Sequence, residues 1–289
     1  MRFISCKNIL VIGLGLFFLM QVPLRLANAQ ALVIAPQNVE LGDRDRGKAI
    51  RLSNTADVAR RYDISAVDMV MQENGTLAPA EDGFAYSAAD MLRYAPRRLT
   101  LRPGEQRALR IMFRRKKGMA DGAYHTHLKF KEVPLDDAAV TQDQGGAAPE
   151  AGGSAEFKVG VEYTISVPVV VSKGSLSSSL SLADARYLPK KGDDEESIEI
   201  RFDRSGNGQG VGFVRGVFVD GDKEIGGAIE PMLVKVYRER DWISRKLAFV
   251  QAEGSDHPSN TVRLYLHDGG TADAPVLQVL DVPLPASNS

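Results

Sequence analysis

Apolar and polar positions alternate along much of this chain with a period of two. The longest example is residues 157–171, FKVGVEYTISVPVVV, in which every odd position is apolar. Side chains of a strand point alternately to its two faces, so this run predicts a strand with one continuous apolar face. At about 3.3 Å per residue the run would be roughly 50 Å long, whereas typical strands have about 5–6 residues. One sandwich does not need so long a stripe, and part of it is predicted to pack against something else.

Shorter alternating segments recur at spacings that are typical of a β-sandwich. Residues 49–54 (AIRLSN), 61–67 (RYDISAV) and 121–130 (DGAYHTHLKF) each predict a strand with one apolar face. Residues 98–113 (RLTLRPGEQRALRIMF) predict a hairpin whose turn is the Pro-Gly pair. Residues 87–95 (SAADMLRYA) predict one helical turn at most. The fold class is therefore predicted to be all-β.

A change of composition separates the strands of the first half from the long stripe. Residues 135–156 are rich in Gly, Ala, Asp and Gln and carry no apolar stripe, which indicates a flexible segment. Two interpretations remain open, a domain boundary or a long hairpin loop inside the first domain. We favour the loop, because the strand that begins at Phe157 needs a partner. The first domain is then expected to span residues 30–174.

A second β-rich section follows, with further alternating segments and a turn at Asp220-Gly221-Asp222. It predicts a second sandwich over residues 175–289. The prediction is thus two β-sandwich domains.

The first residues have the features of a secretory signal peptide. Arg2 and Lys7 precede an apolar run over residues 9–20, and Ala27-Asn28-Ala29 forms an A-x-A cleavage site. Residues 1–29 are predicted to be removed before Gln30. An uncleaved anchor is the alternative, but the apolar run is short for a membrane span. No later run reaches that length, so no integral membrane segment is expected after cleavage.

Charge argues against one class of partner, and cysteine content argues against disulfide bonds in the mature chain. The leader holds three of the 36 basic residues and none of the 37 acidic ones, so the mature chain has 33 against 37, a net charge of −4. This balance does not favour a nucleic-acid partner. The single cysteine, Cys6, lies in the leader, so the mature sandwiches must be stable without disulfides.

The chain shows no catalytic constellation. His125 and His127 are spaced i,i+2 on a predicted strand and share one face, which offers two metal ligands. No third ligand is placed beside them, so exposed or hydrogen-bonded histidines are favoured. The chain also lacks G-x-S-x-G, H-E-x-x-H and a plausible carboxylate pair. We expect no enzyme activity, no cofactor and no metal.

Several motifs in a fixed order resemble the periplasmic pilus-assembly chaperones, the PapD-like family. A leader is followed by VIAPQNVELGDRDRGKAIRLSN, by APRRLTLRPGEQRALRIMF and by DGAYHTHLKFKEVP. The resemblance is good over residues 32–172 and weaker over residues 175–285. The matching positions are Pro36, Asn54, Pro96, Leu101, Pro103, Gly104, Glu105, Arg110, Ile111, Asp121, Gly122, Tyr124, His127, Leu128, Phe130 and Pro134.

The resemblance implies a use for the long stripe. Such chaperones have two immunoglobulin-like β-sandwich domains and lend the last strand of the first domain to a pilus subunit that lacks one, which is β-augmentation. The lent side chains would be Phe157, Val159, Val161, Tyr163 and Ile165.

The resemblance also implies a grip on the subunit's terminal carboxylate by two cations. Those family positions are Asn38 and Ser166 here, and neither is cationic. Lys173, Lys158 or Arg51 would have to substitute.

The sequence therefore predicts a periplasmic chaperone whose partners are pilus or fimbrial subunits and an outer-membrane usher. Two alternatives stay open. The same sandwiches would also suit a fibre subunit or adhesin, in which the stripe is donated within a polymer. A secreted carbohydrate-binding module is the third hypothesis, but the chain has only one tryptophan, Trp242.

Overall fold

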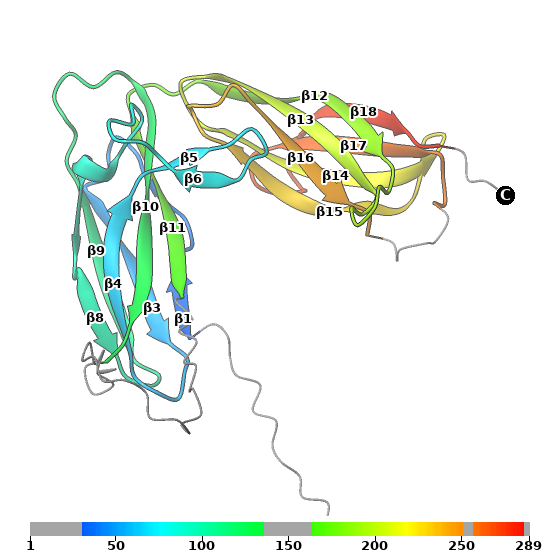
Figure 1. Cartoon of the computed structure of the whole chain (residues 1–289). Coiled ribbons are helices and arrows are strands. Elements are labelled where there is room, and N and C mark those ends of the chain that lie inside the picture. Colours follow the sequence, from blue (N-terminus) through cyan, green and yellow to red (C-terminus); the bar gives the residue numbers. More distant parts are fainter. Residues whose placement is uncertain (1–30, 136–162, 251–256, 286–289) are drawn as a thin grey trace, which may run out of the picture.

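The chain is all-β and forms two β-sandwiches that meet at an angle (Figure 1). The computed structural model describes residues 31–135, 163–250 and 257–285. Within these ranges the only helical segment is a single 3-10 turn, η1 (Ala89–Met91), inside the segment for which one helical turn was predicted. The all-β prediction is confirmed.

The first sandwich packs a four-stranded sheet against a five-stranded sheet. The four-stranded sheet has the order β1 (Leu32–Ala35), β3 (Gly47–Asn54), β9 (Gln106–Phe113), β7 (Leu92–Ala95). The five-stranded sheet has the order β2 (Val39–Leu41), β11 (Thr164–Lys173), β10 (Gly122–Val133), β4 (Arg60–Val67), β8 (Arg98–Leu101). The first strand thus switches from one sheet to the other between β1 and β2, which leaves β2 beside β11.

The apolar faces predicted for this sandwich form its core. Ile50 and Leu52 of β3 are fully buried against Leu128 and Phe130 of β10 in one hydrophobic cluster. The intervening residues of β3, such as Arg51, point to solvent. The alternation of apolar and polar residues therefore predicted correctly which face of β3 and of β10 points into the core.

The predicted hairpin over residues 98–113 is wrong. β8 pairs with β4, whereas β9 pairs with β3 and β7, so the two segments lie in different sheets. The chain does turn at Pro103-Gly104, where Gly104 has a φ of +70°. The buried side chain of Asn54 holds this corner, because its amide donates to the carbonyl oxygens of Leu101 and Arg102 at 3.0 and 3.2 Å. A tight turn that joins two sheets has the same Pro-Gly sequence pattern as a turn within a hairpin, so the sequence does not distinguish the two.

The strands on either side of residues 135–156 pair with each other. β10 and β11 are antiparallel, from Gly122 opposite Lys173 to Lys131 opposite Thr164. This pairing makes β11 a strand of the first sandwich and sets which of its residues lie beside β10.

The second sandwich packs a three-stranded sheet against a four-stranded one. The first has the order β12 (Ser178–Leu188), β13 (Ser197–Gly206), β16 (Trp242–Ala248). The second has the order β15 (Lys223–Val236), β14 (Gly210–Asp220), β17 (Thr261–Asp268), β18 (Val276–Pro283). The turn predicted at residues 220–222 joins β14 to β15, with Asp220 opposite Lys223 and Gly221 at a φ of +59°.

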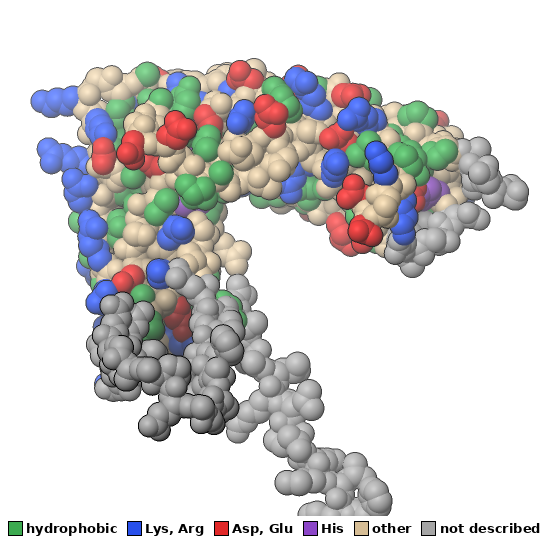
Figure 2. Space-filling model, in the orientation of Figure 1, with side chains coloured by type: hydrophobic (Ala, Val, Ile, Leu, Met, Phe, Trp, Pro, Cys, Tyr) green, Lys and Arg blue, Asp and Glu red, His purple; other side chains and the backbone are tan. Residues whose placement is uncertain are grey.

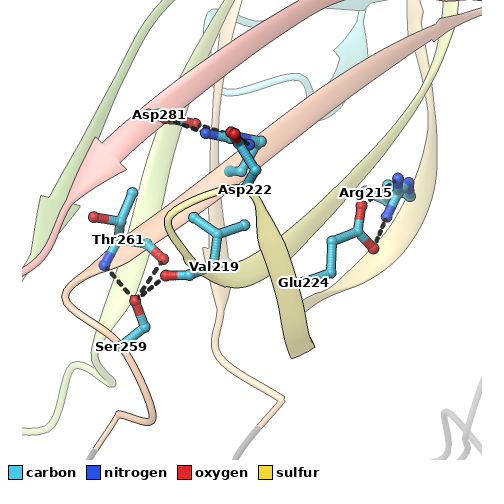
Figure 3. A network of polar contacts seen from close by, with 8 residues as sticks. Arg215, Val219, Asp222, Glu224, Ser259, Thr261 and Asp281 are labelled. Carbon is cyan, nitrogen blue, oxygen red and sulfur yellow. Dashed lines mark hydrogen bonds and ion pairs between the residues drawn. The ribbon is translucent and has the colours of Figure 1, made fainter.

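A polar network closes the end of the second sandwich that lies away from the first (Figure 3). Arg215 and Glu224 form a bidentate pair at 3.0 and 2.9 Å, and the hydroxyl of Ser259 bonds with the backbone of Val219 and Thr261. Exposed ion pairs of this kind contribute about 0–1 kcal/mol each. The network therefore orders the turns at this end rather than holding the sandwich together.

A short hairpin of the first sandwich reaches over to the second (Figure 1). It consists of β5 (Met69–Met71) and β6 (Leu77–Pro79). Arg240 donates to the carbonyl oxygen of Met71 at 2.6 Å, and the backbone N–H of Ser244 donates to that of Glu73 at 2.7 Å. Met71 also packs in the core cluster of the second sandwich. Backbone hydrogen bonds and apolar contacts therefore link the two sandwiches.

The two strand histidines lie at this junction and are almost fully buried, each 2% exposed. The Nε2 of His125 lies 3.0 Å from a carboxylate oxygen of Glu239, and its ring stacks on Tyr237 with 4.0 Å between centroids. The hydrogen-bonded prediction is confirmed for His125, but the exposed alternative is wrong for both histidines. The alternation places both on the outer face of the sheet, where Tyr237 of the second sandwich contacts both rings and Phe84 of the first sandwich contacts His125.

Candidate partner-binding edge

Burial along β11 falls steadily toward the N-terminal end of the strand. Val171, Val169 and Val167 are 0%, 0% and 2% exposed and belong to the core of the first sandwich. Ile165 is only partly buried and packs against that core from outside, and the side chain of Tyr163 is 51% exposed. The apolar stripe thus leaves the core at about Ile165. The other proposed donor residues, Phe157, Val159 and Val161, lie outside the described residues.

One edge of β11 is open over the same stretch. β10 lies along the whole strand on one side, but on the other side β2 pairs only with residues 169–171. Among the residues that the structure describes, no strand pairs with this edge at residues 164–168. An unpaired edge presents backbone N–H and C=O groups that a further strand can bind. The open edge and the emerging stripe coincide.

Ser166 lies on the outer face of this sheet, in a cross-strand row that contains a lysine. Lys129 of β10 is directly opposite Ser166, and Ser65 of β4 is opposite Lys129 on the other side. Directly opposed residues have Cβ atoms about 4.5–5.5 Å apart. Lys129 is partly buried, and its side chain makes no hydrogen bond or ion pair with any residue in the described ranges. A cation flanked by two hydroxyl groups therefore lies beside the position where the family resemblance implies a lysine.

Asn38 lies where the first sandwich approaches the second. Its side-chain amide donates to a carboxylate oxygen of Glu40 at 2.8 Å. The same oxygen of Glu40 is 3.7 Å from the ammonium group of Lys235 in β15. Asn38 itself is not cationic, but Glu40, two residues later in the chain, pairs with Lys235 of the second sandwich.

Two of the three cations suggested as substitutes do not occupy this position. Lys173 already donates to the carbonyl oxygen of Met119 and lies 3.3 Å from a carboxylate oxygen of Asp121. Arg51 belongs to the other sheet and points away from β11. Lys158 lies outside the described residues. Sequence reasoning missed Lys129, because its place opposite Ser166 depends on the register between β10 and β11.

Burial at the junction changes the titration of its side chains. Desolvation, together with the charge of His125, lowers the pKa of His127 to about 4. Desolvation, together with the nearby Glu239, raises the pKa of Tyr237 to about 12. Burial alone would raise the pKa of Glu239, but hydrogen bonds from His125 and from backbone N–H groups outweigh it, and the pKa is lowered. At neutral pH the junction thus contains a neutral His127 and a carboxylate that accepts hydrogen bonds.

A groove of about 850 Å³ lies where the β5–β6 hairpin meets the outer face of the β12–β13–β16 sheet. Trp242 lines it, and the guanidinium of Arg201 lies over the indole ring, 4.6 Å from its centroid. Because Arg201 covers one face of the ring, this face is not a free stacking platform for a sugar.

The described part of the chain contains neither a cluster of metal ligands nor a helix that could span a membrane. No group of three or more His, Cys, Asp or Glu side chains there is arranged to hold a metal ion. No helix in the same ranges is long and apolar enough to cross a membrane.

Comparison with known proteins gives similarity only among solved structures. No family model and no curated protein sequence matches the chain. Three similar structures are the CsuC–CsuE chaperone–tip adhesion subunit pre-assembly complex of Acinetobacter baumannii, the CupB2 chaperone of Pseudomonas aeruginosa, and the SafA pilin of Salmonella enterica in complex with the SafB chaperone.

The similarity to these structures is long but weak. The identities are 13%, 12% and 12%, and the TM-scores are 0.43, 0.42 and 0.41. Each match covers 88% of this chain and, in the same order, 98%, 100% and 96% of the other chain. The names of these similar structures are those of chaperones, alone or with a tip adhesion subunit or a pilin, and identities this low do not by themselves assign a function.

Proposed function

We propose that this protein is a periplasmic chaperone that binds subunits of a surface fibre by donating a β-strand. The single observation that carries the proposal is the coincidence at β11 of an open edge and an apolar stripe that leaves the core. The donated side chains would be those of Ile165 and Tyr163 and, beyond them, Val161, Val159 and Phe157. Cleavage of residues 1–29, release into the periplasm and delivery to an outer-membrane usher are parts of the same proposal.

The energetics of the edge suit this role. Complete burial of a large apolar side chain contributes about 1.5–3 kcal/mol, and Tyr163 is still half exposed in the free chain. A strand added along residues 164–168 would also pair the backbone groups of the open edge. Several such side chains together offset the cost of ordering the donated segment.

Lys129 is proposed as the residue that meets the subunit's terminal carboxylate. It lies on the outer face of the same sheet, one strand away from the open edge, and its ammonium group has no acidic partner within the described ranges. The flanking Ser65 and Ser166 supply hydroxyl donors at the same level of the sheet. A lysine ammonium binds a carboxylate through charge-assisted hydrogen bonds.

The test is a pair of substitutions in the stripe. Val161→Arg should leave thermal unfolding of the free protein unchanged and abolish co-purification with a fibre subunit encoded nearby, since the charge would enter an apolar groove unpaired. Ile165→Arg should lower the melting temperature, because Ile165 packs against the core. If Val161→Arg melts the free protein as much as Ile165→Arg does, the whole stripe is internal core and the proposal fails. Subunit ladders in place of one-to-one complexes would favour a fibre subunit.

A further inference from the structure

Among the described residues, the outer face of the β1–β3–β9–β7 sheet carries no acidic side chain. This face lies on the opposite side of the first sandwich from the β11 sheet. Its three charged residues are all arginines, one each from β3, β9 and β7: Arg51, Arg110 and Arg93. The other outward positions are small, polar or apolar: Val33, Ala35, Gly47, Ala49, Ser53, Ala95, Gln106, Ala108 and Met112.

Small residues flank two of the three arginines along their cross-strand rows, whereas Arg93 lies opposite Met112. Arg51 lies between Ala35 and Ala108. Arg110 lies between Ala49 and Ala95 in the next row of this face. Directly opposed residues are about 4.5–5.5 Å apart, so a larger neighbour would cover the guanidinium group. Alanine on both sides leaves the planar fork open for bidentate binding.

None of the three arginines has an acidic partner among the described residues. The side chains of Arg51 and Arg110 make no hydrogen bond or ion pair with any residue that the structure describes, and the side chain of Arg93 donates to the carbonyl oxygens of Asp90 and Leu92. On the other sheet of the same sandwich, by contrast, Arg60 pairs with Glu132 and Arg98 pairs with Asp63. Unlike these two arginines of the other sheet, the three arginines of this face have no acidic partner among the described residues.

The three arginines form a diagonal line across the sheet. Arg51 is opposite Ala108, two residues before Arg110, and Arg110 is opposite Ala95, two residues after Arg93. Such diagonal neighbours are about 7–8 Å apart. Residues i and i+2 of an extended peptide are about 6.6–6.8 Å apart and lie on one face. An extended peptide with acidic residues at alternate positions therefore matches the arginine line in both charge and spacing.

We propose that this arginine face (Arg51, Arg93, Arg110 and their small neighbours) docks an extended acidic segment of a partner protein. The carboxylates at positions i, i+2 and i+4 would each meet one guanidinium, and a groove of about 640 Å³ beside Ala35, Pro36 and Arg51 receives one end of the segment. The arginine–carboxylate fork is among the stronger charge-assisted pairs. Because this face and the open edge of β11 belong to different sheets, both can be occupied at once.

The experiment uses two labelled peptides of equal composition. One has aspartates at three alternate positions among Ser and Thr, and the other has the same three aspartates in succession. Fluorescence anisotropy with the mature protein should show about tenfold tighter binding of the alternating peptide. Arg51→Gln with Arg110→Gln should abolish this preference without changing the melting temperature.

A matched control removes two charges elsewhere in the first sandwich. Arg44→Gln with Lys117→Gln alters two exposed loop residues and should keep the preference for the alternating peptide. Equal affinity for the two peptides would overturn the proposal, and so would an equal loss of the preference in the control variant. Either result would show only a general attraction between opposite charges. Retention on phosphatidylglycerol vesicles without peptide binding would also overturn it, in favour of an anionic lipid surface.

Discussion

His125 of the first sandwich and Glu239 of the second form a buried pair, with 3.0 Å between Nε2 and Oε2. Their side chains are only 2% and 6% exposed. The other carboxylate oxygen of Glu239, Oε1, accepts a hydrogen bond from the backbone N–H of Met71 at 3.1 Å. One carboxylate thus joins a strand and a hairpin of the first sandwich to the second. Removing one partner of such a buried pair costs more than the pair contributes, because a charged group stays behind.

Stability is expected to fall as the pH is lowered through the titration range of His127. Its pKa is about 4 in the folded protein and about 6.5 when unfolded, so the unfolded chain binds more protons between these values. The stabilisation is therefore complete above about pH 6.5 and is lost as the pH falls toward 4, by about 3 kcal/mol. Glu239, whose pKa is lowered, adds a loss in the same direction below about pH 4.5. Urea unfolding at pH 7.5, 5.5 and 4.5 measures the slope.

The variant His127→Gln tests whether His127 causes this pH dependence of the unfolding free energy. Gln has no titratable group, so the difference in unfolding free energy between pH 7.5 and 4.5 should shrink, even if the variant is less stable at both. An unchanged pH dependence would show that other groups cause it.

Gly122→Ala should destabilise the junction between the sandwiches. Gly122 has a φ of +146°, and a Cβ there would meet the guanidinium of Arg238 and lie 2.9 Å from the carbonyl oxygen of Asn207. The comparison variant is Gly118→Ala, where φ is +77° and no atom lies within 4 Å of the added Cβ. Both variants are destabilised by backbone strain, but only in Gly122→Ala does the added Cβ clash with neighbouring atoms. Gly122→Ala should therefore lower the free energy of unfolding by about 1–3 kcal/mol more than Gly118→Ala. Equal melting temperatures for the two variants would contradict a tight junction.

Asn54→Ala should weaken the corner between β8 and β9. The Asn54 amide donates to the carbonyl oxygens of Leu101 and Arg102, and its loss leaves buried acceptors without a donor at a cost of about 1–3 kcal/mol. Asn74→Ala, in the exposed loop of the β5–β6 hairpin, serves as control and should change the unfolding free energy little. A corner variant as stable as the control would show that the backbone alone holds this turn.

Lys129→Gln should weaken subunit binding without changing the stability of the free protein. Loss of the ammonium group removes the proposed partner of the terminal carboxylate, which is expected to lower affinity about tenfold or more. Lys131→Gln, on the same face one row further along, should have a smaller effect. Calorimetric titration with a subunit and with its C-terminally amidated form measures both. If Lys129→Gln weakens both forms equally, Lys129 does not bind the carboxylate.

The sequence by itself determined the character of the strands and the inward face of most of them. Alternation is a local property, since each residue turns its side chain to the opposite face from its neighbour, and a buried face must be apolar wherever it packs. Ile50, Leu128 and Phe130 therefore lie in the core where the pattern places them. The same rule covers the β14–β15 turn, in which Gly221 supplies a positive φ.

Only the tertiary structure decided how the strands pair. The Pro103-Gly104 turn is visible in the sequence, but its two arms lie in different sheets because β8 pairs with β4 and β9 pairs with β3, strands that are distant in the sequence. Likewise, Lys129 meets Ser166 only through the register of β10 against β11. His125 and His127 are buried because a second sandwich covers the face on which they lie. Pairing, register and coverage are non-local, because each is fixed by the best packing of segments that are distant in sequence, and alternation within one segment carries no information about them.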